Sequence, residues 1–500
     1  MKVPADAGGP QEPLDHTAIR RIVLGILLAM FLGALDQTIV ATALATIGRE
    51  LADVDNLSWV VTAYLVTATA VTPLYGKLSD IHGRRAMLLL AISVFAVGSV
   101  ASALAPTMTA LIIARAVQGL GGGGLLSLAQ TIIADIIPPR ERGRYQGYVG
   151  AVFASSSIGG PVLGGFFAEH LHWSLIFWIN LPLGLLALVI TNKALKRLPR
   201  HEQRHSLDFL GAALMMAATV ALLLVLTWGG ARYPWGSPRI LGLLALSLAL
   251  AVLFVFRQLH AREPFLPLSI FNNPVVGVGT AAVTLVFGTM VGLVIFVPIY
   301  FEVVQHLSAS QSGLALIPQL SGTVIGATLV GRAMRHREHY KRMPIAGLAV
   351  TIAGLVLLAI KPDFPVIVVC AVTGLVGLGI GAVFPVTTIS IQNAVSLNQL
   401  GTATGAMNFF RSLGGALAVS GFGAIILGGA GGREGLTLTA LAAQASQDGT
   451  NLSHSFGLLF AVAAGCIAAG LICLLLMEER PLRGEPMPPA QPARQVSELS

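Results

Sequence analysis

One acidic residue, Asp36, lies in the middle of an apolar stretch that is long enough to cross a membrane. A carboxylate in hydrocarbon is unfavourable, so such a residue is rare unless it faces an interior cavity and has a function there. We therefore expect Asp36 to bind a proton or a cation. The alternative is a carboxylate held to a neighbouring helix by hydrogen bonds. Gln37, Thr38 and Thr42 lie beside it, and the two threonines share a helical stripe that could line a water-filled path.

A second ionisable side chain, Arg115, also lies within an apolar run. At helical spacing, Arg115, Gln118, Gly119 and Gly122 fall on one face of that segment. The small residues on this face let another helix approach, so the guanidinium points toward a helix contact at membrane depth. Burial disfavours a charged carboxylate and a nearby cation favours it. We therefore expect Arg115 to set how readily Asp36 exchanges its proton.

The elements that carry these residues are long apolar segments. The chain has 500 residues, of which 55% are hydrophobic and only 11% charged, and this composition indicates an all-α polytopic membrane protein. Apolar runs of ~20 residues, enough to cross the hydrocarbon core as helix, recur about fourteen times. The first run has no small-residue cleavage site and is too long for a signal peptide, so we expect it to be retained as a span. The predicted spans are 22–45, 57–75, 86–105, 109–133, 146–168, 174–193, 207–228, 239–258, 275–301, 311–331, 344–361, 364–389, 404–427 and 455–477.

The basic residues gather in alternate loops between these spans. The formal net charge of +8 would suggest a nucleic-acid partner for a soluble protein, but this distribution indicates membrane orientation instead. Under the positive-inside rule the basic loops and both termini are cytoplasmic. We expect a multi-pass protein of the cell membrane that contacts the lipid bilayer and no nucleic acid. The residues that set this orientation are Arg20, Arg21, Lys77, Arg84, Arg85, Arg140, Arg142, Arg144, Lys193, Lys196, Arg197, Arg200, Arg204, Arg257, Arg262, Arg332, Arg335, Arg337, Lys341 and Arg342.

The sequence repeats itself at a shift of 255 residues. In this register Gly76 falls on Gly331 and Gly119 falls on Gly374. We interpret spans 1–6 and 9–14 as two copies of one six-helix unit, with spans 7–8 inserted between them. Parallel repeats of this kind flank a cavity near the membrane midplane in transporters. Further pairs in the same register are Gly122 with Gly377, Gly124 with Gly379, Gly159 with Gly414 and Gly160 with Gly415.

The two copies differ in chemistry. Asp36 maps to Val291 and Arg115 maps to Cys370, so we expect the coupling chemistry in the first half. The three cysteines all fall inside spans and indicate free thiols rather than a disulfide or metal framework. The predicted domains are an N-terminal cytoplasmic tail (1–19), an N-terminal six-helix bundle (20–200), an inserted helix pair (201–262), a C-terminal six-helix bundle (263–480) and a disordered cytoplasmic tail (481–500).

The loop after the second span carries a recognisable motif. Its residues GKLSDIHGRR, beginning at Gly76, resemble the signature of the major facilitator superfamily, although Ile81 and His82 depart from the commonest pattern. The resemblance implies a cytoplasmic latch between the two halves of the protein. We predict that Asp80 interacts with the positive end of the span 13 helix, around 401–405. The alternative is a simple positive-inside anchor. The residues assigned to this gate are Gly76, Asp80, Gly83, Arg84 and Arg85.

Three further stretches are similar to the fourteen-span multidrug:proton antiporters within that superfamily. They are LDQTIV from Leu35, in a span where Ala45 stands in place of a frequent proline, SWVVTAY from Ser58, and RAVQGLGG from Arg115. In span 5, GGPVLGG from Gly159 resembles a motif associated with antiporters. The alternative interpretation of this motif is ordinary helix packing. The resemblance implies a major facilitator fold, two six-helix bundles plus two inserted helices, and assigns a packing role to Gly160, Pro161, Gly164 and Gly165.

A second arginine within a span, Arg411, belongs to NFFRSLGG, a run from Asn408 that is similar to the span 13 pattern of the same branch. Arg411 could face the cavity and favour anionic groups, or extend to the cytoplasmic surface. We assign Asn408 and Arg411 to the substrate cavity together with Gln37, Thr38, Thr42 and Gln118. The connection 428–454 is expected to be a solvated loop, with a lid as the alternative.

The resemblance implies a secondary active transporter rather than an enzyme. We expect a monomeric, proton-coupled exporter of amphipathic, cationic drugs or toxic compounds, driven by the proton gradient without a cofactor or a metal. Neither a phosphate-binding loop nor a nucleophile elbow occurs in the sequence. The alternatives are an exporter or flippase of a lipid or a secreted metabolite and, in another class, a non-transporting receptor or scaffold, which would not need Asp36 and Arg115 inside the bilayer.

Overall fold

The structure is a computed structural model that describes residues 16–53, 56–197, 208–230, 232–335, 337, 339–429 and 453–482. It has fourteen helical segments long and apolar enough to cross a membrane, so the predicted all-α polytopic fold is confirmed. The predicted loop 428–454 and both predicted tails lie largely outside the described residues. The principal helices are α1 (His16–Glu50), α2 (Leu57–His82), α3 (Arg84–Ala103), α4 (Met108–Ile136), α5 (Pro139–His170), α6 (Leu175–Trp178), α7 (Asn180–Ala194), α8 (Phe209–Trp228), α9 (Pro238–His260), α10 (Pro274–Val303), α11 (Ala309–Ala315), α12 (Ile317–Ala333), α13 (Arg342–Ile360), α14 (Val366–Asn393), α15 (Leu400–Gly429) and α17 (Ser453–Leu476).

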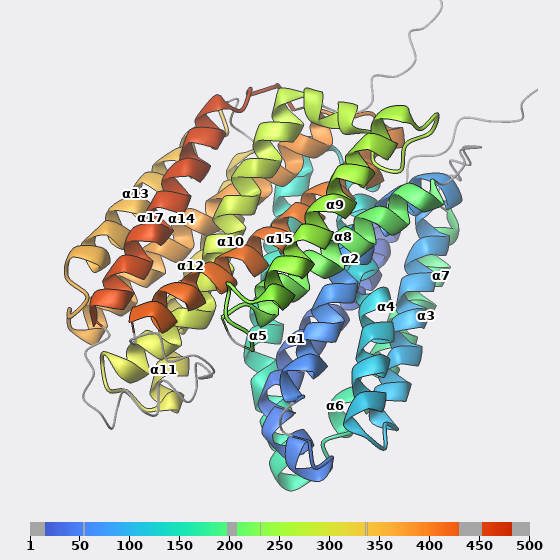
Figure 1. Cartoon of the computed structure of the whole chain (residues 1–500). Coiled ribbons are helices and arrows are strands. Elements are labelled where there is room, and N and C mark those ends of the chain that lie inside the picture. The colour runs from blue at the N-terminus through green and yellow to red at the C-terminus, as the bar shows by residue number, and fades with distance from the viewer. Residues whose placement is uncertain are drawn as a thin grey trace, which may run out of the picture.

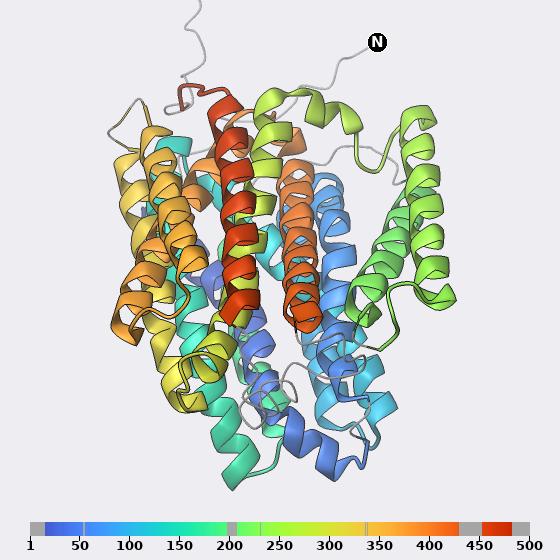
Figure 2. The ribbon, with the colours of Figure 1, turned by 60° about the vertical axis from the view of Figure 1, so that its left-hand side comes forward.

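Helices α1 to α7 and α10 to α17 form two bundles, and α8 and α9 stand beside them (Figures 1 and 2). The inserted pair packs through α8 against α2 of the first bundle and α15 of the second, whereas α9 contacts α8 and leaves much of its surface exposed. Figure 2 shows the pair at one edge of the molecule. Helix α9 is apolar on its exposed side, as expected for a helix that faces lipid.

The basic residues at the end of α2 and the start of α3, Lys77, Arg84 and Arg85, define one end of the molecule, called the basic end below. Helix α1 begins and α17 ends at this same end, at the top of Figure 1. Each bundle has its own apolar core. Ile26 and Phe95 are fully buried in the first, and Tyr300 stacks edge to face with Phe456 and Phe460 in the second.

Glycine contacts follow the 255-residue register. Gly122 of α4 packs against Tyr64 of α2, and Gly377 of α14 packs against Gln319 of α12, so both partners in the pair are shifted by the same amount. A side chain at either glycine would overlap the neighbouring helix. Equivalent positions therefore join the second and fourth spans of both copies, through the Tyr64 side chain in the first and the Gln319 backbone carbonyl in the second.

The two bundles touch each other through a second pair of glycine contacts. Gly76 of α2 lies against the carbonyl of Gly401 in α15, and Gly331 of α12 lies against the carbonyl of Gly143 in α5. Gly76 and Gly331 are equivalent in the repeat. Both contacts lie near the basic end, so the bundles are closed against each other there.

The sixth span is broken where it meets the functional site. Helix α6 ends at Trp178 and α7 begins at Asn180, with Pro182 in the first turn of α7. Proline has no N–H to donate and is tolerated in the first turn of a helix. The break places the Asn180 side chain inside the first bundle, where it is fully buried.

Candidate functional site

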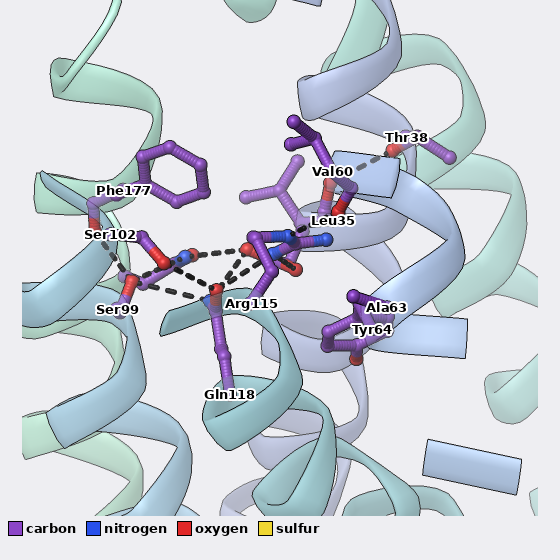
Figure 3. A network of polar contacts seen from close by, with 12 residues as sticks. Leu35, Thr38, Val60, Ala63, Tyr64, Ser99, Ser102, Arg115, Gln118 and Phe177 are labelled. Carbon is purple, nitrogen blue, oxygen red and sulfur yellow. Dashed lines mark hydrogen bonds and ion pairs between the residues drawn. The ribbon is translucent and has the colours of Figure 1, made fainter. Parts of the chain in front are cut away.

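Asp36 of α1 and Arg115 of α4 form an ion pair in the interior of the first bundle. Arg115 Nη1 donates to Asp36 Oδ2 at 2.6 Å, and the two side chains are 1% and 0% exposed. Figure 3 shows Arg115 at the centre of the surrounding polar side chains. The sequence predicted both residues as functional and predicted that they act together, and the structure brings them into direct contact.

Two more side chains complete the hydrogen bonds of Asp36, and a third, Ser99, extends the network. Gln118 Nε2 and Asn180 Nδ2 donate to Asp36 Oδ1 at 2.8 and 2.9 Å. Asn180 also donates to Ser99 Oγ at 3.0 Å, and Ser99 donates to the carbonyl of Phe177 at 2.9 Å. The network therefore joins α1, α3, α4 and the break between α6 and α7. Sequence reasoning missed Ser99 and Asn180; an asparagine inside the apolar run LIFWINLPLG was the available signal for the latter.

Arg115 has partners on its remaining sides as well. Its Nε donates to the carbonyl of Val60 at 3.0 Å, and its Nη1 also donates to Gln118 Oε1 at 2.7 Å. The guanidinium lies over the ring of Tyr64 at 4.4 Å and the ring of Phe177 at 5.6 Å. A buried ion pair is tolerated when additional hydrogen bonds satisfy both partners. The pair thus sits in a site built to hold opposite charges.

A cavity of about 650 Å³ lies between the two bundles. Gln37 and Tyr64 line it from the first bundle, and Asn408 and Arg411 line it from the second. Its walls are mainly apolar, and it reaches the connection between α8 and α9 at the end opposite the basic end. Neither Asp36 nor Arg115 lines this cavity. Tyr64 borders it and also stacks on Arg115, so its ring lies between the ion pair and the cavity.

Three predicted cavity residues are placed elsewhere. Thr38 donates to the carbonyl of Ser156 in α5 at 2.8 Å, and Thr42 lies on the same α1 surface against α5. Gln118 belongs to the ion-pair network. None of the three lines this cavity in the structure. Helical spacing showed that the threonines share a face but not which neighbouring helix that face meets.

The glycine motif of α5 supplies the other side of the threonine contact. Gly160 packs against Thr38, and Gly164 packs against Thr42 and the carbonyl of Ile39. Gly165 has nothing within 4 Å of the position where a side chain would begin, and Pro161 is exposed within α5. Gly160 and Gly164 therefore hold α5 close to the segment of α1 that carries Asp36, whereas Gly165 and Pro161 take no part in this contact.

The predicted contact of Asp80 with the start of the thirteenth span is present. Asp80 accepts hydrogen bonds from the backbone N–H groups of Gly401 and Thr402 at 3.1 and 2.8 Å and from the Thr402 hydroxyl at 2.7 Å. Arg84 donates to Asp80 and, through Nε, to Asp135 at 2.7 Å. A carboxylate at a helix N-terminus is stabilised by the exposed N–H groups and the helix dipole. These bonds link the two bundles at the basic end.

The rest of this loop shapes the turn between α2 and α3. Gly83 has a φ of +87°, a conformation that side chains disfavour, and it separates the two helices. Arg85 donates to Asn192 near the end of α7. The turn thus directs Arg84 toward Asp80 and Arg85 toward the neighbouring helix.

The inserted pair α8 and α9 adds a wall to the cavity that was not predicted from the sequence. Leu226 and Thr227 of α8 and Trp235 of the following connection line the cavity. Trp228 at the end of α8 stacks edge to face on Trp59 of α2, with ring centroids 5.4 Å apart. The pair therefore covers the cavity along the side where α2 and α15 meet.

The chain matches the Major Facilitator Superfamily over residues 26–419. It is 37% identical over 437 residues to an uncharacterized MFS-type transporter of Mycobacterium tuberculosis, an alignment that covers 87% of this chain and 63% of that protein. The chain thus spans less than two thirds of the length of this relative. It is 34% identical over 406 residues to the multidrug transporter protein MdtP of Bacillus subtilis, covering 81% of this chain and 75% of that protein.

A solved structure has a similar fold. The crystal structure of a bacterial homologue of the iron transporter ferroportin, in its outward-facing state, aligns with a TM-score of 0.61 at 13% identity and covers 93% of this chain and 100% of that one. This likeness concerns the fold alone.

Proposed function

The chain belongs to the major facilitator superfamily, and we propose that it is a proton-coupled exporter of amphipathic compounds. The observation that carries this proposal is the fully buried pair of Asp36 and Arg115 beside a largely apolar cavity. The name of the MdtP relative, a multidrug transporter, supports drug-like compounds as the substrates. The prediction that substrates are cationic depends on Asp36 reaching the cavity in another state of the cycle.

Proton binding at Asp36 would change the energy of the site in a defined way. A protonated Asp36 no longer compensates Arg115, and an uncompensated buried charge is strongly unfavourable. Arg115 would keep its bonds to Gln118 and to the carbonyl of Val60, which lie on α4 and α2. The expected response is a shift of α1 relative to α4, because the hydrogen bonds that Asp36 accepts from Arg115 and Gln118 join these two helices.

Tyr64 is the residue through which this shift would reach the cavity. Its ring contacts Arg115 on one side and the cavity on the other. Movement of Arg115 would therefore move a cavity wall, so that protonation and substrate binding oppose each other through one site. This coupling is the requirement for an antiporter.

The proposal is tested in proteoliposomes with ethidium as the transported compound. We expect the wild-type protein to move ethidium in the direction opposite to an imposed inward flux of protons. An uncoupler should abolish this movement. Asp36→Asn keeps the size of the side chain but cannot ionise, so its residual transport should not depend on the gradient. Glu169→Gln is the matched control, because Glu169 is an exposed acid at the end of α5. Transport by Asp36→Asn at the wild-type rate, with wild-type dependence on the gradient, would refute the proposal.

A further inference from the structure

Arg411 is a buried cation in the wall of the cavity. It lies eleven residues beyond the start of α15, about 16 Å along the helix axis, so it is deep within the span. The residue is only 7% exposed, and it borders the cavity. A side chain at this depth cannot easily place its charge in the interfacial water. Of the two alternatives left by the sequence, the structure supports a side chain that faces the cavity.

The guanidinium of Arg411 makes no hydrogen bond or ion pair with any described residue. Its Nε is buried without a partner, and its one polar interaction of another kind is with the face of Phe287, 4.6 Å from the ring centroid. Asn408, one turn earlier on the helix, instead donates to Gln130 of α4 at 3.0 Å. A buried charge without a partner is unfavourable, so the site is incomplete in this structure.

The cavity wall offers no internal counter-charge. Among the described residues that line it, Arg411 is the sole charged side chain, and none is an aspartate or a glutamate. The buried acid Asp36 is not available to Arg411, because both of its carboxylate oxygens already accept hydrogen bonds from Arg115, Gln118 and Asn180. The missing partner of Arg411 must therefore come from what enters the cavity.

We propose that Arg411 is an oxyanion-binding subsite of the cavity, and that the compounds bound there carry a carboxylate, sulfonate or phosphate group on an apolar body. A guanidinium recognises such groups through paired hydrogen bonds. Ser412 lies next to Arg411 on the wall, and Leu226, Val291 and Val419 provide apolar surface for the rest of the molecule. The inference rests on the proposed export function and adds anionic and zwitterionic amphipaths to its substrates, beside the cationic compounds assigned to Asp36.

The test compares two fluorescent probes that differ by one oxyanion. 1-Anilinonaphthalene-8-sulfonate carries a sulfonate, and N-phenyl-1-naphthylamine has the same aromatic body without it. Both are titrated against the purified full-length protein in nanodiscs of phosphatidylcholine, without a proton gradient. We expect Arg411→Gln to weaken sulfonate binding about tenfold, which corresponds to about 1.4 kcal/mol, and to change binding of the neutral probe less than twofold.

Two further variants separate this role from a general effect of charge. Arg49→Gln removes one positive charge from an exposed position at the end of α1 and should leave both probes unaffected. Arg411→Lys retains the charge but not the paired donors and should fall between the wild type and Arg411→Gln. Equal effects of Arg411→Gln on both probes, or no effect on either, would overturn the subsite.

A second lipid composition distinguishes a bound amphipath from an anionic lipid headgroup. If phosphatidylglycerol filled the subsite, the ratio of sulfonate affinities between the wild type and Arg411→Gln would fall to one in discs that contain this lipid. We expect the ratio to be the same in both kinds of disc, and its loss would overturn the assignment to amphipaths that enter from solution. These measurements need no gradient, so they can fail while ethidium transport remains proton-driven, and they can succeed if it does not.

Discussion

Two buried arginines in the same protein have opposite surroundings. Arg115 in the first bundle has a carboxylate, a glutamine, a backbone carbonyl and two aromatic rings around it. Arg411 in the second has a single aromatic ring and an open cavity. The first is therefore a site completed by the protein, and in the proposed mechanism its state changes when Asp36 takes up a proton. The second is a site that a bound compound has to complete.

The repeat sharpens this contrast, because neither arginine has an equivalent in the other half. Arg115 corresponds to Cys370, and Arg411 corresponds to Ser156, which packs at the contact between α1 and α5. The backbone contacts of glycine are kept in both halves while the charged groups are not. Packing is thus shared between the halves, and chemistry is divided between them.

The largest expected effect separates the two arginines by stability. Arg115→Ala leaves Asp36 as a buried charge without its cation and should lower the free energy of unfolding by about 3–5 kcal/mol at neutral pH. Arg411→Ala removes a charge that has no internal partner and should be neutral or stabilising. Thermal unfolding of the detergent-solubilised variants measures the difference.

Lowering the pH provides a control for the same comparison. Protonation of Asp36 removes the uncompensated charge, so the loss of stability caused by Arg115→Ala should shrink as the pH falls. The stability of Arg411→Ala relative to the wild type should not follow this trend. Equal losses for the two alanine variants at neutral pH would show that the two sites do not differ as described.

A second prediction concerns the packing that the halves share. Gly76→Ala and Gly331→Ala each place a methyl group against the backbone carbonyl of the opposite bundle. Overpacking of this kind is typically unfavourable by about 1–3 kcal/mol. Both variants should weaken closure at the basic end to a similar degree, measured as the labelling rate of a cysteine introduced between α2 and α15 in a cysteine-free background. A large effect from one variant alone would contradict equivalent roles.

The smallest effect is expected at the gate residue Asp80, which has no equivalent acid in the second half. Asp80→Asn keeps the shape of the side chain but removes the charge at the start of α15, where such interactions contribute about 0.3–1 kcal/mol, up to about 2 kcal/mol when partly buried. It should lower turnover several-fold while leaving substrate affinity nearly unchanged. Arg335→Gln, at the equivalent position of the second half, is exposed and should transport normally. Unchanged turnover in Asp80→Asn would argue against a latch.

The sequence was sufficient for the features that depend on one helix at a time. Span lengths predicted the fold, and isolated ionisable residues in apolar runs identified Asp36, Arg115 and Arg411. Which helix faces would contact each other was harder to predict from the sequence. Nothing in the spacing of Thr38 and Thr42 showed that they would meet α5, and Ser99 is one of many serines in apolar segments that gave no sign of a partner.

The contact of Asp80 with α15 was predictable for a different reason. Its motif resembles one with a known place in the superfamily, and the dipole of a helix that starts at the same end supplied the partner. Arg411 had no such guide, because a buried arginine is compatible with either a cavity or a snorkelling position until the neighbouring side chains are known. The burial of Arg411 deep within α15 and its place in the cavity wall decided between them.

The ion pair also constrains how the protein is made. Asp36 and Arg115 are 79 residues apart, so at ribosomal rates of about 5–20 residues per second the acid is synthesised roughly 4–16 s before its partner. A charged residue at the centre of a newly inserted helix is unfavourable by about 2.5–3.5 kcal/mol during translocon-mediated insertion. Helix α1 must therefore enter the bilayer with a neutral Asp36 or remain beside the translocon until α4 arrives. Either way, biogenesis of the first bundle has to tolerate a period in which its central acid has no cation.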